Sequence, residues 1–240
     1  MDENMVLEKL IQFGLTRQEA NIYLCLYRNG EMSGYEVAKY TGISRSNVYS
    51  GLSDLTEKGA AYLMESNVNR YVAVPIEEFC DNKIRTLNSV RDDLVAHIPA
   101  VKQETPGYIT IEGCSNIQNK MLTMLATAKK RVYISAKSEY VELFHAELET
   151  LVRKNIKVVI ITDGTVTSPV LNEEAIIYLG EDRENIIHLI VDSQFAISGE
   201  VNWQKEDTCL YTGQENFIHV FKEMLRNEMK LIEIDRKGNA

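Results

Sequence analysis

A cluster of polar side chains suited to DNA recognition lies near residue 45 of this 240-residue chain. Arginine and asparagine can bind guanine and adenine edges, and serine hydroxyls can bind phosphates or bases. Helical spacing predicts that these side chains lie opposite an apolar face, at the start of a helix whose free N–H groups favour phosphate. Asp54 would repel phosphate, so contacts are expected in the first two turns. The candidate residues are Arg45, Ser46, Asn47 and Ser50.

The surrounding residues 33–59 predict a helix-turn-helix, whose second helix enters the DNA major groove. Gly42 suits the tight turn between the helices, Ser44 is a candidate N-cap, and Gly59 ends the second helix. Two alternating segments, 60–64 and 70–74, predict a hairpin that forms a wing. The wing adds candidate DNA contacts at Asn67, Asn69 and Arg70.

Two other interpretations of this region stay open. A winged helix can serve only for packing or protein contact, and each polar residue taken singly suits a solvated helix face. The net charge of −9 also opposes nucleic-acid binding. It does not exclude it, because only the docking face must be positive, but it predicts few phosphate contacts.

Apolar residues at steps of three and four predict an amphipathic helix that begins at Pro75 and continues to about Lys102, with Pro99 ending or kinking it. Such a helix can pair with its copy in a second subunit or pack on its own C-terminal domain, and the pattern does not separate the two. Dimerisation is favoured because helix-turn-helix proteins bind paired half-sites. The apolar positions are Phe79, Cys80, Ile84, Leu87, Val90, Leu94, Ile98 and Val101.

The N-terminal part resembles the TrmB-like family of transcriptional regulators. The resemblance lies in residues 13–26, where Gly-Leu-Thr is followed by Glu-Ala and Tyr23, and in residues 44–59. It implies a winged DNA-binding domain, a dimerisation helix after it, and a C-terminal domain that often senses a ligand.

The sequence divides into three predicted parts, giving an α/β protein overall. Residues 1–75 form a winged helix-turn-helix domain, 76–104 a linking and dimerisation helix, and 105–240 an α/β effector-sensing domain that follows a linker at Thr105–Gly107. In the last part, strands are expected at 108–112, 131–135 and 156–162, with a further strand or hairpin at 184–195. Helices are expected at 114–130, 141–154 and 217–228.

The segment 187–203 resembles the active-site hairpin of the phospholipase D superfamily. Asp192, Gly199, Asn202 and Trp203 match that family's pattern, as does 214–216 before the last helix. The family's catalytic histidine and lysine positions hold Asn185 and Ile187. Asparagine cannot form the phosphohistidine adduct, and isoleucine supplies no charge. No catalytic residues are therefore expected, and the domain is interpreted as an inactive enzyme retained for binding.

A small polar effector is expected to bind at the ends of the strands, with a sugar or nucleoside as the suited class. Each of three candidates also has a simpler interpretation: Trp203 can pack in the core, Asp163 can form a turn, and Lys137 can be a solvated surface charge. The candidate effector-binding residues are Ser135, Lys137, Asp163, Asp192, Asn202 and Trp203.

No metal site, cofactor or disulfide framework is expected, because the four cysteines are far apart and lie near no histidine pair. No apolar run reaches membrane-spanning length, and the N-terminal residues lack the basic start and apolar core of a secretory signal, so a cytoplasmic protein is expected. The preferred function is a dimeric regulator that binds double-stranded DNA and responds to a small molecule, with a sugar or related metabolite as one candidate. The alternative is a phosphodiesterase or nuclease targeted to DNA by the winged domain.

Overall fold

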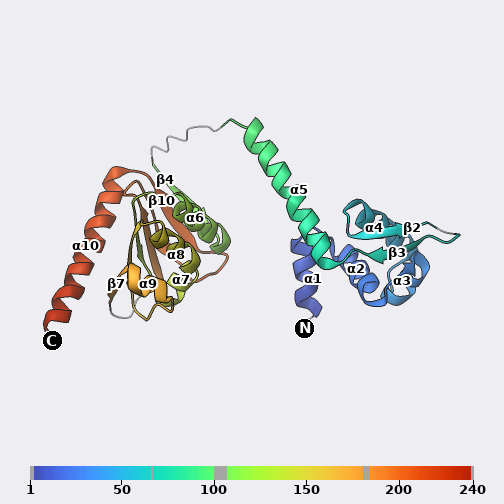
Figure 1. The fold of residues 1–240 in the computed structure, drawn as a ribbon, viewed down its shortest axis with the longest axis horizontal. Helices are drawn as coiled ribbons and strands as arrows, with labels where there is room; N and C mark the ends of the chain where they lie inside the picture. The colour runs from blue at the N-terminus through green and yellow to red at the C-terminus, as the bar shows by residue number, and fades with distance from the viewer. Residues whose placement is uncertain (1–2, 66, 100–106, 181–183, 239–240) are drawn as a thin grey trace. The chain divides into compact units, whose positions relative to one another are not determined.

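The computed structural model describes residues 3–65, 67–99, 107–180 and 184–238. The chain divides into two compact units, residues 1–101 and 102–240. The first unit contains helices, a small sheet and a long helix, and the second is built on a large mixed sheet (Figure 1). The α/β fold class is confirmed.

The first unit begins with α1 (Glu3–Gln12) and α2 (Arg17–Asn29), followed by the short strand β1 (Met32–Ser33). Thr16 forms a capping box with Glu19 at the start of α2. Next come α3 (Gly34–Thr41) and α4 (Arg45–Glu57), separated by Gly42 in the left-handed conformation with a φ of 71°. The predicted helix-turn-helix and its glycine turn are therefore present.

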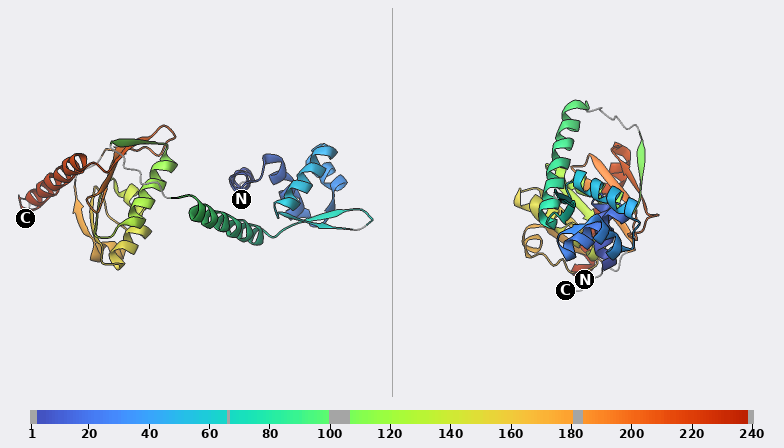
Figure 2. Two further views of the ribbon diagram at one scale, coloured as in Figure 1. Left: turned by 90° about the horizontal axis from the view of Figure 1, so that it is seen from above. Right: turned by 90° about the vertical axis from the view of Figure 1, so that its right-hand side faces the viewer.

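The predicted wing is an antiparallel hairpin of β2 (Ala61–Met64) and β3 (Arg70–Ala73) that extends beyond the helices (Figure 2). The sheet order is β1-β3-β2. Strand β1, which sequence reasoning missed, is only two residues long and pairs with the far side of β3. One apolar core, which includes Ile22, Tyr23 and Leu26 of α2, joins these elements.

Helix α5 (Ile76–His97) closes the first unit. It ends before the predicted limit because Ile98, which precedes Pro99, is extended with φ −94° and ψ 110°. Residues 100–104 of the predicted linking helix and most of the predicted linker lie outside the described residues.

The second unit has a seven-stranded sheet of order β4-β10-β9-β8-β5-β6-β7, in which β5, β6 and β7 are parallel and the other pairs are antiparallel. The strands are β4 (Tyr108–Glu112), β5 (Arg131–Ser135), β6 (Lys157–Thr162), β7 (Ile176–Leu179), β8 (Ile186–Val191), β9 (Phe195–Glu200) and β10 (Thr208–Thr212). The helices are α6 (Cys114–Thr127), α7 (Ser138–Glu142), α8 (His145–Arg153), α9 (Pro169–Glu174) and α10 (Glu215–Gly238).

Each face of the sheet has its own apolar core. On one face, α6, α8 and α9 pack on residues such as Val132, Ile134 and Ile160, and on the other α10 packs on Ile161 and Ile190 (Figure 1). The single helix predicted at 141–154 is wrong, because α7 and α8 are separate helices. The closing helix is longer than predicted, running from 215 to 238 instead of 217 to 228.

Candidate nucleic-acid interface and effector site

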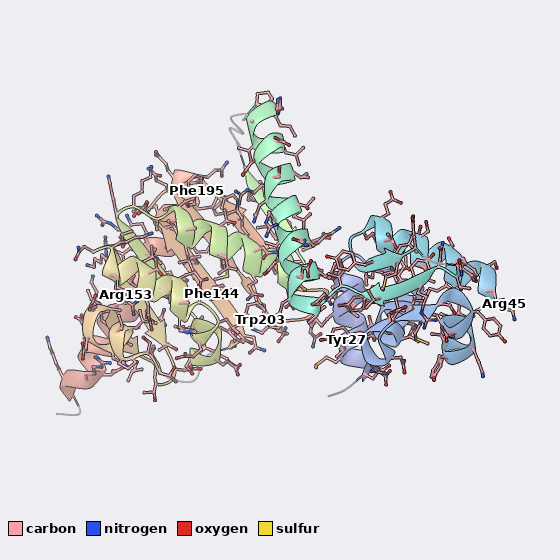
Figure 3. The ribbon with its side chains drawn as sticks, turned by 45° about the vertical axis from the view of Figure 1, so that its right-hand side comes forward. Tyr27, Arg45, Phe144, Arg153, Phe195 and Trp203 are labelled. Carbon is pink, nitrogen blue, oxygen red and sulfur yellow. The ribbon has the colours of Figure 1, made fainter. Side chains whose placement is uncertain are left out.

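Helix α4 has one fully buried face and one exposed polar face. Val48, Leu52 and Leu55 are each 0% exposed and pack in the core of the first unit. The four predicted DNA-contacting residues of α4 are all exposed: Arg45, Ser46, Asn47 and Ser50. Figure 3 shows Arg45 at the rim of the first unit, with its side chain directed outward.

The N-terminus of α4 can attract an anion, because no acidic side chain in its first turn offsets the positive end of the helix dipole. The Ser44 hydroxyl accepts a hydrogen bond from the Asn47 N–H at 3.4 Å, and no acidic residue lies in the first turn. The partial positive charge of the helix start is therefore not neutralised within that turn. The Arg45 guanidinium carbon lies 4.5 Å above the centre of the Tyr35 ring, a cation–π contact that links α3 to this end of α4.

A close approach between α3 and α4 requires a glycine at the first position of α3. A Cβ on Gly34 would come within 2.6 Å of the Tyr49 ring. Tyr49 is itself 49% exposed, so it extends the polar face of α4 with an aromatic side chain. Sequence reasoning missed Tyr35 and Tyr49 because their periodicity marks neither a core nor a charged face.

The wing presents Asn67 and Asn69 to solvent, but Arg70 does not offer a free charge. Its guanidinium pairs with Glu31 at 2.6 Å and Glu36 at 3.5 Å, and donates to the Glu31 carbonyl at 3.0 Å. The prediction treated Arg70 as an available DNA contact. In the structure its guanidinium is already ion-paired with two carboxylates at the base of the wing. Those acidic partners lie 39 and 34 positions earlier, which no local pattern reveals.

In the second unit, Lys137 and Asp163 lie together at the carboxyl ends of β5 and β6. With Ser138 and Glu139 they line a shallow pocket of about 410 Å³. The Ser138 N–H donates to Asp163 Oδ1 at 2.9 Å, which fixes one carboxylate oxygen beside the pocket. One ammonium group, two carboxylates and one hydroxyl can hold a polar molecule there.

Asn202 and Trp203 lie at the same edge of the sheet, just after β9. The Asn202 amide oxygen accepts a hydrogen bond from the side chain of Asn185, and the Trp203 ring meets Tyr140 edge-to-face at 5.4 Å. Buried Asp207 orders this turn by accepting from the Asn202 N–H at 3.0 Å. Two buried polar atoms of the described residues lack a hydrogen-bond partner, Trp203 Nε1 and Thr162 Oγ1.

Two predicted effector residues do not line this pocket. Ser135 is 0% exposed and opposes His188 in the sheet, so its hydroxyl does not line the pocket. Asp192 lies in the turn after β8, at the opposite end of β5 from Lys137. Its carboxylate accepts three backbone hydrogen bonds, from Lys129, Lys130 and Arg131 at 2.7–2.9 Å. Asp192 lies at the other end because β8 runs antiparallel to β5, whereas Ser135 ends β5 at the predicted edge but is buried.

The electrostatics of Asp192 suit a structural role. Burial by itself would raise the pKa of Asp192, but the hydrogen bonds from the Arg131, Lys129 and Lys130 N–H groups prevail and hold it below its usual value. Asp192 and Ser193 both have positive φ angles, 52° and 57°, so the turn is conformationally demanding. The hydrogen bonds hold this turn against the start of β5.

Asn185 and Ile187 are the two residues that the sequence resemblance to the phospholipase D superfamily singles out. Asn185 is hydrogen-bonded to Asn202, and Ile187 is fully buried in the core. His188 lies on the α10 side, where its Nδ1 is 2.8 Å from the Ser198 hydroxyl and its ring meets Phe221 at 5.9 Å. Among the described residues, no cluster of three metal-binding side chains is present. Within the same residues, no helix has the length and apolar character to cross a membrane.

Comparison with known proteins covers both units. The family model "Sugar-specific transcriptional regulator TrmB" matches residues 10–77. A second model, the N-terminal subdomain of the EBD of the transcriptional regulator TrmB, matches residues 107–228, slightly more than half of the chain.

Two curated relatives and one solved structure are similar to the chain. The uncharacterized protein YrhO of Bacillus subtilis is 26% identical, with 99% of this chain and 88% of that protein covered. The sugar-sensing regulator TrmBL1 of Pyrococcus furiosus is 27% identical over 68% of this chain and 49% of its own length. The structure of TrmBL2, an archaeal chromatin protein, has a TM-score of 0.48 at 16% identity, covering 96% of this chain and 99% of that one. The chain belongs to the TrmB family of transcriptional regulators, and is a DNA-binding regulator with a winged helix-turn-helix.

Proposed function

We propose that the protein is a dimeric transcriptional regulator in which the exposed face of α4 binds double-stranded DNA and the second unit binds a small-molecule effector. The observation that carries this proposal is the division of α4 into two faces. Arg45, Ser46, Asn47 and Ser50 are exposed, while the apolar positions between them are buried. Polar residues with an uncompensated helix N-terminus suit both base edges and phosphates.

The DNA contacts are proposed to be few, in keeping with the acidic chain. In the first turns of α4, Arg45 supplies the formal positive charge, and Asn67 and Asn69 of the wing add neutral donors. Base-edge contacts must then contribute a large part of the affinity, and the salt dependence of binding should be shallow. The test is a fluorescence anisotropy titration against the DNA upstream of the gene and against a scrambled duplex, each at three salt concentrations. Equal, steeply salt-dependent affinity for both duplexes contradicts the proposal.

Dimerisation is proposed to use the apolar side of α5. Phe79 is the buried residue of this helix, whereas a row of large apolar side chains is about half exposed. These side chains recur at steps of three and four and can pack against the same row of a second copy. The row is formed by Ile84, Leu87, Val90, Leu94 and Ile98. Residues 76–104 are accordingly proposed as the dimerisation segment.

The effector is proposed to bind at the edge formed by the ends of β5, β6 and β9. Lys137 and Asp163 supply charges, Asn202 supplies an amide, and Trp203 supplies an aromatic face. Sugars bind well to sites that combine aromatic rings with amides and carboxylates, and the printed names of the family model and of TrmBL1 both refer to sugar. A sugar or related metabolite is therefore the proposed class. It would act by favouring one dimer geometry over another.

The second unit is proposed to bind without catalysis. A nucleophile is missing at Asn185, and Ile187 cannot stabilise a phosphoryl charge. A plasmid nuclease assay with and without added Mg²⁺ tests this directly, and no turnover is expected. Turnover that disappears in Asp192→Ala would contradict it.

A further inference from the structure

Helix α10 has two separate apolar faces, and only one of them is used within the second unit. The inner face packs on the large sheet through Ile218, Leu225 and Ile232, each at most 9% exposed. Phe221 and Met229 complete this contact as partly buried residues. The inner face therefore explains how α10 is held in place.

The outer face carries a second apolar row, which we call the outer seam of α10. Val220 is 62%, Met224 37%, Leu231 61% and Ile234 63% exposed. These residues are spaced by 4, 7 and 3 positions, and Asn227 occupies the one position that completes an alternation of 4 and 3. These large apolar side chains are left partly or mostly uncovered by the rest of the second unit.

Alternating steps of three and four are the repeat by which two helices pack side by side. A polar residue within such a seam, here Asn227, lowers stability but restricts register and partner choice. The repeat has no role in packing α10 on its sheet, since the inner face has its own set of apolar residues. It indicates a partner helix.

We propose that the outer seam of α10 pairs in antiparallel orientation with the outer seam of a second copy of this chain, as a self-association surface distinct from α5. In that arrangement Val220 faces Leu231 of the second copy, and Met224 faces Asn227. Because the two copies are related by a two-fold axis, each of these contacts occurs twice in the interface.

Charge complementarity favours this occupant and this orientation. Glu223 and Lys230 border the outer seam on one side, and antiparallel pairing places each opposite the other type in the second copy. Parallel pairing would instead oppose Glu223 and Glu228. Within its own helix Glu223 also pairs with Arg226 at 2.6 Å, which leaves the side chain on that border.

The test uses the full-length protein with cysteines introduced at Val220 and Leu231. A mixture of the Val220→Cys and Leu231→Cys proteins is treated with a short bis-maleimide reagent, and linked peptides are identified by mass spectrometry. We expect the 220–231 link in the mixture. Neither protein alone should link to itself, because identical positions are about 16 Å apart along the axis. Self-linking of either variant, or no 220–231 link, overturns the proposal.

A second measurement asks whether the seam contributes affinity. Leu231→Glu should raise the dissociation constant for self-association roughly tenfold or more in sedimentation analysis, while His219→Glu, exposed on another side of α10, should not. Equal behaviour of the two variants contradicts the proposal. A negative result in this measurement does not contradict the proposed dimer through α5, because that dimer is tested separately with substitutions in α5.

Discussion

Lys58 Nζ lies 2.6 Å from Glu19 Oε2, which links the end of α4 to the first turn of α2. Glu19 is only 4% exposed and also accepts the Thr16 N–H of its capping box. Lys58 donates a second hydrogen bond, to the Gly14 carbonyl at 3.2 Å. The orientation of α4 within the first unit is thus fixed at its far end by one buried carboxylate.

Replacing the lysine should therefore destabilise the first unit. Lys58→Met leaves a buried carboxylate without its cation, and because Lys58 is one-third exposed the expected cost is about 1–3 kcal/mol. Urea unfolding measures it, with Lys39→Met as the control on an exposed side chain. Equal midpoints for the two variants would contradict this role.

The same pair makes a prediction about pH. Burial would raise the pKa of Glu19, but Lys58 and the Thr16 N–H together lower it below the usual 4.5. A carboxylate whose pKa is lower in the folded state than in the unfolded state stabilises the fold above pH 4.5. This stabilisation is lost as the pH falls through the folded-state pKa of Glu19. The difference in stability between wild type and Lys58→Met should accordingly shrink below about pH 4.5. A constant difference would show that the carboxylate does not titrate as described.

Asp192→Asn should destabilise the second unit without changing the effector site. The amide cannot accept from all of the three N–H groups that the carboxylate binds, and its own NH₂ opposes them, so about 1–2 kcal/mol should be lost. The difference in stability between wild type and Asp192→Asn is present above pH 3.8 and shrinks as the pH drops through the lowered pKa of Asp192. Denaturation of the second unit, followed by Trp203 fluorescence at pH 7 and pH 3, measures both effects. Unchanged stability at pH 7 argues against the structural role.

Trp203 is the single tryptophan of the chain, so its fluorescence reports on the proposed effector edge. Titration with glucose, galactose, maltose and sucrose should change the emission with at least one of them. Lys137→Ala should weaken that response roughly tenfold, while Lys154→Ala, outside the pocket, should not. A response that survives Lys137→Ala unchanged would place the ligand elsewhere, and no response to the four sugars would contradict a simple sugar effector.

Dimerisation through α5 is testable with matched glutamates. Leu94→Glu places a charge in the exposed apolar row, so dimers in sedimentation analysis should dissociate at concentrations at which wild type remains paired. Ser89→Glu adds the same charge on another exposed side of the helix and should leave the dimer intact. If Leu94→Glu dimerises like wild type, α5 is not the interface.

Local patterns predicted those elements whose ends are marked by a cap or a turn. Ser44 and Gly42 act as predicted, because they stabilise helix ends through contacts within four residues. The bounds predicted for β4 and β5, 108–112 and 131–135, also match the structure. The phospholipase D-like resemblance of the second unit stays a prediction.

Contacts between distant segments were not predictable in the same way. Asp192 was placed at the effector edge because a strand end is visible in sequence, but strand direction is not. Ser135 does end its strand at that edge, but its burial depends on the neighbouring elements. The neutralisation of Arg70 by Glu31 and Glu36 depends on β1 pairing with β3, and a two-residue strand leaves no periodic signal. Lys137 and Asp163 meet because β5 and β6 are adjacent and parallel, which the α/β pattern did suggest.

The most direct test of the account is the DNA affinity of Arg45→Ala and Asn47→Ala relative to Arg17→Ala. Arg17 is also exposed but lies at the start of α2, near the far end of α4. Each α4 variant should weaken binding to the upstream duplex roughly tenfold or more and reduce its preference over a scrambled duplex, whereas Arg17→Ala should retain both. Full affinity and preference in both α4 variants would contradict DNA recognition by this helix.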